Sequence, residues 1–102
     1  MKVLLHVSDL NQIKRMQNNI NNLLKEDETI SISVFANDMA IKSFVKSEDT
    51  IINDKVHYYI CSNSMRSYNV NADDLLVGTE ATSSGVYKIL LLQEVGYHYI
   101  KV

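Results

Sequence analysis

The chain has one cysteine among its 102 residues, and this scarcity excludes several kinds of structure. A single thiol, that of Cys61, cannot form an internal disulfide or supply a zinc site built from several cysteines. It also cannot form a Cys-X-X-Cys redox pair, which needs a second cysteine to resolve a mixed disulfide. Any covalent chemistry at Cys61 therefore needs a separate reaction partner.

The sequence also lacks a surplus of positive charge and any long apolar run. Ten Lys and Arg residues are outnumbered by twelve Asp and Glu residues, so the formal net charge is -2 at pH 7. Nucleic acid would therefore find no basic surface to bind. No segment is long enough to span a membrane, and the apolar run at residues 2–6 is too short for a signal peptide. We expect a cytoplasmic protein with no nucleic-acid or membrane partner.

What the chain does contain is a regular alternation of strand and helix patterns. Apolar residues make up 46% of it, which is typical of a globular protein, and its length predicts a single domain over residues 1–102. Residues 2–7 form a short apolar run typical of a buried strand. From Leu10 to Leu24 the apolar residues recur at three-and-four spacing, which predicts an amphipathic helix capped by Asp9. Residues 30–35 alternate between apolar and polar side chains, as in a strand.

The second half of the chain continues this alternation. Asn37 or Asp38 is expected to cap a short helix. Residues 46–55 are expected to form a loop, residues 56–60 a strand and residues 72–76 a helical turn. Residues 79–82 form a weaker strand candidate, residues 86–95 a helix that ends at Gly96, and residues 97–102 a final strand. Since the gaps between strands are long enough for crossovers, the prediction is an α/β fold: a three-layer α/β/α sandwich with a five-stranded parallel sheet.

Candidate site residues follow from this fold, because the carboxyl ends of parallel strands meet at one edge of a sheet. Cys61 directly follows the third predicted strand, at its carboxyl end, and no acidic residue lies within four positions of it. The other candidates are polar residues at the strand ends and beside the cysteine: His6, Asn37, Asn63, Ser64, Ser83 and Ser84. Asn63 and Ser64 can donate hydrogen bonds to sulfur, and His6 could take a proton from a thiol near neutral pH.

A purely structural interpretation competes with each of these assignments. Free cysteine is among the most buried residue types, so Cys61 could be packed in the core. Serine and asparagine at strand exits are common helix caps, and a histidine that ends an apolar strand is often a half-buried packing residue. His57 and His98 show no metal-ligand spacing, so no metal or cofactor is expected. The chain also lacks a phosphate loop and the Ser-His-acid order of a hydrolase.

Five segments in order resemble one known family. They are KVLLH at residues 2–6, NNINNLL at 18–24, VFAN at 34–37, CSNSM at 61–65 and QEVGYHYI at 93–100. Over essentially the whole chain the sequence resembles the small DsrE/DsrF-like proteins of the intracellular sulfur relay superfamily. That resemblance implies a five-stranded parallel α/β/α sandwich, assembly as a trimer or hexamer, and sulfane sulfur carried as a persulfide on the cysteine similar to Cys61.

Two functional hypotheses remain open at this stage, and whether the protein is an enzyme is left undecided. The first is a sulfur-relay or sulfur-binding protein in which Cys61 accepts a persulfide from a donor protein or passes it to an acceptor protein. The second is a non-catalytic oligomeric module that binds a small anionic ligand at the carboxyl edge of the sheet, with Cys61 only packed. Under either hypothesis the six tyrosines favour a homo-oligomer, since tyrosine is enriched at protein interfaces.

Overall fold

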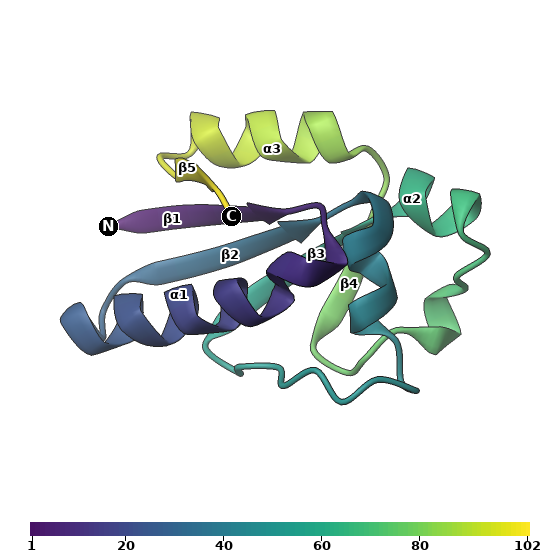
Figure 1. Cartoon of the computed structure of the whole chain (residues 1–102). Helices are drawn as coiled ribbons and strands as arrows, with labels where there is room; N and C mark the ends of the chain where they lie inside the picture. The colour runs from purple at the N-terminus through teal and green to yellow at the C-terminus, as the bar shows by residue number, and fades with distance from the viewer.

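The structure is a computed structural model that describes all 102 residues. Five strands form one sheet in the order β4-β3-β2-β1-β5 (Figure 1). They are β1 (Lys2–Val7), β2 (Ser31–Ala36), β3 (Val56–Cys61), β4 (Thr79–Thr82) and β5 (His98–Lys101). All four neighbouring pairs are parallel. The predicted α/β fold with a five-stranded parallel sheet is therefore confirmed.

Helices cover both faces of the sheet, which makes it the middle of three layers. Helices α1 (Ile13–Glu26) and α3 (Gly85–Glu94) lie on opposite sides of it (Figure 1). The direction of the chain explains this, because β1, β2, β3 and β4 advance one way across the sheet and β5 returns to the far side of β1. Right-handed crossovers that run in opposite directions place their helices on opposite faces.

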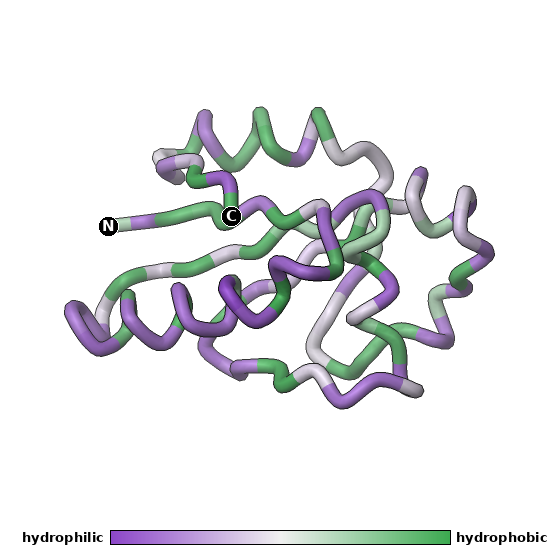
Figure 2. The backbone as a smooth tube through the Cα atoms, in the orientation of Figure 1, coloured by the Kyte–Doolittle hydropathy of each residue, from purple (hydrophilic) through white to green (hydrophobic).

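The core is divided between these two faces. On the α1 face, alternate strand residues pack against Ile13, Met16 and Ile20 of the helix. On the α3 face a smaller buried cluster contains Leu4, Phe35, Cys61 and Leu92. Figure 2 shows α1 as largely hydrophilic apart from its inner positions, whereas α3 carries hydrophobic residues along its length. This difference indicates that α1 has a solvated outer face and that α3 has an apolar one.

Two details of the first half of the chain differ from the sequence-based prediction. The strand expected to alternate, β2, is buried at every position from Ile32 to Ala36, because helices cover both sides of the sheet. The Asp9 side chain caps nothing. A short 3-10 turn, η1 (Leu10–Gln12), precedes α1, and the Gln12 N–H donates to the backbone oxygen of Asp9 at 3.1 Å.

The remaining elements follow the predicted order, but the types of some short helices differ from the prediction. The short helix after β2 is a 3-10 helix, η2 (Asp38–Phe44), and the turn near residue 72 is another, η3 (Ala72–Asp74). A short helix not predicted from the sequence, α2 (Ser62–Ser67), starts directly after β3. Gly96, with a φ of +98°, follows α3 as predicted, since the left-handed conformation favours glycine. None of the helices has the length and apolar character needed to cross a membrane.

Candidate functional site

The carboxyl edge of the sheet brings His6, Asn37 and Cys61 onto the face covered by α3. His6 is paired in register with Phe35, and the two rings lie 5.4 Å apart between centroids. Phe35 also packs in the same buried cluster as Cys61. Asn37 lies two residues beyond Phe35, so it points to the same face of the extended backbone. Three strands therefore contribute one residue each to a single surface.

His6 is the centre of a hydrogen-bonded network that connects three parts of the chain. Its Nδ1 lies 2.6 Å from the hydroxyl oxygen of Tyr99 on β5, and its Nε2 lies 2.9 Å from Oδ1 of Asn37. The Ser8 hydroxyl donates to the same Asn37 oxygen at 2.6 Å and lies 3.3 Å from His6 Nε2. Both ring nitrogens of His6 are thus engaged, and neither is bonded to Cys61.

The surroundings of His6 favour its neutral form. Burial lowers the pKa of His6 below its ordinary value of 6.5. The hydrogen bond that His6 donates to the Asn37 oxygen opposes this shift, the positive charge of Lys101 adds to it, and the negative charge of Asp38 opposes it. An imidazole that is neutral at pH 7 can donate one hydrogen bond and accept another, which is what this network requires.

Cys61 ends β3 at the junction with α2, and its residue surface is only 7% exposed. The other buried members of its cluster are apolar, namely Leu4, Phe35 and Leu92. The structure therefore supports the packed description of Cys61 at rest, while placing it at the rim of the sheet. A reagent would reach the sulfur only if the residues above it moved, or if the reagent were small.

A serine connects the exit of β2 to the helix that follows Cys61. Ser64 is buried in α2, and its hydroxyl oxygen accepts a hydrogen bond from the N–H of Asp38 at 2.8 Å. Asp38 has a φ of +50°, in the left-handed region that aspartate tolerates better than most residues. Ser64 thus fixes the turn that follows Asn37. Asn63 is exposed and accepts a hydrogen bond from Arg66, so this pair lies on the outer surface of α2.

The turn from β4 into α3 closes the site over Phe35. Ser84 caps α3, accepting a hydrogen bond from the N–H of Tyr87 at 3.4 Å, whereas Ser83 is exposed. At Gly85 an added Cβ would lie 2.4 Å from Cζ of Phe35. Only glycine allows this close approach, so the start of α3 is packed directly on the ring that contacts His6 and shares a buried cluster with Cys61.

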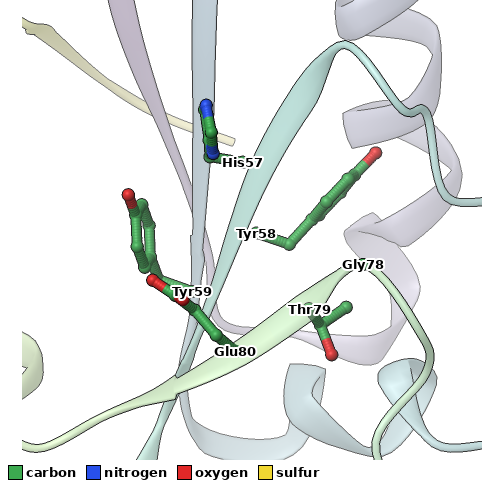
Figure 3. Close-up of a pocket in the computed structure, with 6 residues that line it drawn as sticks. All are labelled: His57, Tyr58, Tyr59, Gly78, Thr79 and Glu80. Atoms are coloured by element: carbon green, nitrogen blue, oxygen red, sulfur yellow. The ribbon is translucent and has the colours of Figure 1, made fainter.

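Two other hollows lie away from this edge. One of about 270 Å³ lies where β3 and β4 begin, with Tyr59 and Glu80 pointing to one side of the strands and Tyr58 and Thr79 to the other (Figure 3). Burial, with the charge of Glu80 nearby, raises the pKa of Tyr59, and the Lys88 ammonium lies 4.1 Å from the centre of its ring. A larger open groove of about 690 Å³ runs between α1 and the loop before β3. No group of three or more His, Cys, Asp or Glu residues is placed to hold a metal ion.

Tyr99 is the site residue that sequence reasoning missed. Its role depends on the pairing of β5 with β1, in which Tyr99 is level with Leu4 and Lys101 with His6. The only available signal was that both Tyr99 and His6 lie in segments predicted to be strands. The sequence did not indicate which strand β5 would pair with, or in which register.

Comparisons with known proteins support the fold. No family model matches the sequence, and no curated protein matches it significantly. Among solved structures, the protein of unknown function MTH1491 from Methanobacterium thermoautotrophicum is 27% identical, with a TM-score of 0.88 over 99% of this chain and 98% of that one. The ychN protein from E. coli is 11% identical, with a TM-score of 0.72 over the full length of both chains. These similarities support the DsrE-like α/β fold that the sequence resemblance implies.

Proposed function

We propose that this chain is a DsrE/DsrF-like protein of the cytoplasm that accepts sulfane sulfur on Cys61. The observation that carries the proposal is the position of Cys61 at the carboxyl edge of the sheet, where the site of a parallel α/β fold lies. The polar groups of His6, Asn37 and Ser64 lie around the same edge. The resemblance of residues 61–65 to the cysteine segment of that family supports the same assignment.

The transfer itself balances without an added oxidant or reductant. The Cys61 thiolate attacks the outer sulfur of a donor persulfide, R–S–SH, and a new S–S bond forms as the bond between the two donor sulfurs breaks. The donor leaves as a thiolate, R–S⁻, and the Cys61 persulfide carries the transferred sulfur. Because Cys61 is the sole cysteine, the sulfur can leave only by transfer to another molecule.

Burial of the thiol sets a condition on the donor. At 7% exposure, Cys61 cannot meet the sulfur of a bulky folded protein without movement of the residues above it. We therefore expect small persulfides to load Cys61 faster than a protein-bound persulfide does.

Mass spectrometry of the intact protein after treatment with a low-molecular-weight persulfide tests the proposal. The expected result is a gain of one sulfur atom by the wild type and none by Cys61→Ser. Ser62→Ala, which leaves the thiol in place, is the matched control and should load like the wild type. If the folded wild type gains no sulfur, the relay proposal is wrong.

The burial of Cys61 favours a second candidate, a module that binds a small anion at the same edge. In that case the hydrogen-bonded network of His6, Asn37 and Ser8 is the functional element, and Cys61 only packs against Phe35. Its test is binding of small inorganic and carboxylate anions measured by calorimetry on Cys61→Ser. Tight binding by this variant, combined with absence of sulfur loading in the wild type, would favour the second candidate.

The proposal includes self-association through α3 and β5. Six apolar or aromatic side chains are exposed along α3, at the residue that follows it and on the α3 side of β5: Val86, Tyr87, Leu90, Leu91, Val95 and Tyr99. The occupant we propose is a second copy of the chain, with a trimer or hexamer expected from the family resemblance. Burial of such a surface against another copy removes apolar area from water.

Light scattering at micromolar concentration tests the assembly. The wild type should be oligomeric, and Leu90→Glu should be monomeric because it places a charge in the apolar surface. Ile51→Glu is the control, since Ile51 is equally apolar and 76% exposed but lies outside this surface. A monomeric wild type, or equal dissociation of both variants, would contradict this interface.

A further inference from the structure

We propose that Tyr99, His6 and Ser8 are positioning residues that hold the Asn37 amide with its N–H groups directed at a persulfide anion on Cys61. This inference rests on the proposed function and extends it, because it identifies the group that would stabilise the loaded form. Tyr99 lies on the last strand and had no predicted part in the site. Four hydrogen-bonding contacts in one network carry the argument.

The direction of each hydrogen bond follows from the groups involved. A phenol is a better donor than acceptor and an unprotonated imidazole nitrogen is a strong acceptor, so the Tyr99 hydroxyl donates to Nδ1 of His6 across 2.6 Å. The neutral ring then carries its proton on Nε2, which donates to Oδ1 of Asn37 across 2.9 Å. Tyr99 therefore selects the tautomer of His6.

Asn37 receives two hydrogen bonds on the same oxygen. Its Oδ1 accepts from His6 Nε2 and from the Ser8 hydroxyl, at 2.9 and 2.6 Å, and two lone pairs suffice for both. The amide N–H groups have no partner within the chain in this arrangement. Reversing the tautomer of His6 would favour the flipped amide, with its nitrogen toward the ring and its oxygen toward the site.

The unpaired N–H groups of Asn37 lie on the side of Cys61. Asn37 directly follows Ala36, whose register partner is Ile60, so it is level with Cys61 on the neighbouring strand. Neighbouring strands are about 4.8 Å apart, and the two side chains share the face covered by α3. His6 and Ser8 hold the amide oxygen from β1, on the opposite side of β2 from β3. The amide nitrogen is left on the β3 side.

A persulfide anion is the ligand that suits these donors. Loading places the reactive sulfur one bond beyond the Cys61 sulfur, where rotation about the S–S and Cβ–S bonds can turn it from the apolar cluster toward the Asn37 amide. The amide donors can form charge-assisted hydrogen bonds with that anion, which stabilise it relative to the free thiol. The flipped amide would instead present its oxygen and repel the anion. The network thus favours the loaded state over the unloaded one.

The experiment measures how much of the protein is loaded at equilibrium with a low-molecular-weight thiol and its persulfide, by mass spectrometry. Asn37→Asp, which replaces the amide donors with a carboxylate, should lower the ratio of persulfide to thiol on Cys61 by about tenfold or more. Tyr99→Phe should lower it by a smaller factor, about threefold, because part of the amide population flips. Tyr68→Phe is the matched control, since Tyr68 packs on the other core cluster, away from this network and from the apolar surface of α3, and its hydroxyl takes part in no hydrogen bond of the chain; its ratio should equal that of the wild type.

A second measurement separates a positioning role from a loss of stability. Nitrogen-15 NMR of the His6 ring should show the Nε2–H tautomer in the wild type and a mixture of tautomers in Tyr99→Phe. An Nδ1–H tautomer in the wild type, or variants that load as well as the wild type, would overturn the inference and leave the relay function standing. If the wild type does not load at all, both the relay function and this inference are wrong.

Discussion

Gly85→Ala tests whether α3 is seated on the sheet as closely as the structure shows. An alanine Cβ at this position would lie 2.4 Å from Cζ of Phe35 and 3.1 and 3.3 Å from two further ring atoms. Ordinary contacts between carbon atoms are about 3.5–4.0 Å, so the ring or the helix must withdraw by about 1 Å. Phe35 is 1% exposed and its ring contacts His6 on one side, so it has little room to move.

The expected cost follows from two opposing effects. Overpacking a well-packed core by one carbon destabilises it by about 1–3 kcal/mol. Alanine restricts the unfolded chain more than glycine does, and the backbone at Gly85 is not left-handed, so the substitution also stabilises by about 0.5–1 kcal/mol. We therefore expect a net destabilisation of about 1–2 kcal/mol. For a domain of this size that corresponds to a fall in Tm of about 4–16 °C.

Urea denaturation measures this cost, and two further variants show where it arises. Gln93→Ala, in the same helix, is the matched control, because Gln93 is exposed and lies outside the apolar surface proposed for self-association, so its truncation should change the unfolding free energy by less than about 0.5 kcal/mol. Phe35→Leu should make room for the new methyl group, so that the double variant is more stable than the sum of the two single changes predicts. Gly85→Ala with wild-type stability would refute the close contact between α3 and Phe35.

Two other predictions concern buried polar groups on the same face. Because the pKa of His6 is lowered in the folded protein, the unfolded chain binds more protons below about pH 6.5, and the unfolding free energy should fall as the pH drops below that value. His6→Gln should remove this part of the pH dependence, and parallel stability curves for the two proteins would contradict the assignment. Ser33→Ala should be neutral or stabilise the protein by about 1 kcal/mol, since the Ser33 hydroxyl is fully buried and has no hydrogen-bond partner. Destabilisation of Ser33→Ala by more than about 1 kcal/mol in urea denaturation would show that the hydroxyl does have a partner.

Helices and strands could be predicted from the sequence where only one face of the element is buried, because burial of one face sets the spacing of its apolar residues. The spacing of Ile13, Met16 and Ile20 predicts α1 correctly because that helix buries a single side. Prediction was less accurate for β2, where Ser33 gives the appearance of alternation although the strand is buried on both faces. A small polar residue can lie in a covered layer, and hydropathy alone then underestimates its burial.

Caps were harder to predict than helices, since a capping residue can be recruited by a tertiary contact. Asn37 is in the capping position before η2, yet its side-chain oxygen binds His6 and Ser8 instead of a helix N–H. Ser84 has no such competitor and caps α3 as expected. A small polar residue at a strand exit can therefore either cap a helix or bond to another strand. The residues that the neighbouring strand presents determine which of the two occurs.

The sequence was sufficient to assign the candidate site to one edge of the sheet. It was not sufficient to predict the hydrogen bonds between the residues of the site. Strand order and register bring Tyr99 to His6, and these depend on β5 pairing with β1 across more than ninety residues of chain. The accessibility of Cys61 is equally a tertiary property, because Cys61 is buried in a cluster with Phe35 and with Leu92 of α3.

Packing and chemistry at this edge are consequently linked through Phe35. The ring contacts His6, packs with Cys61 and supports the first residue of α3, so a movement of α3 that exposed the thiol would also disturb the ring beside His6. Under the proposed function, a sulfur donor that opens the site would therefore act on both the Cys61 thiol and the hydrogen-bonded network of His6 and Asn37. Small donors avoid this cost, which is the physical reason for expecting them to load Cys61 faster.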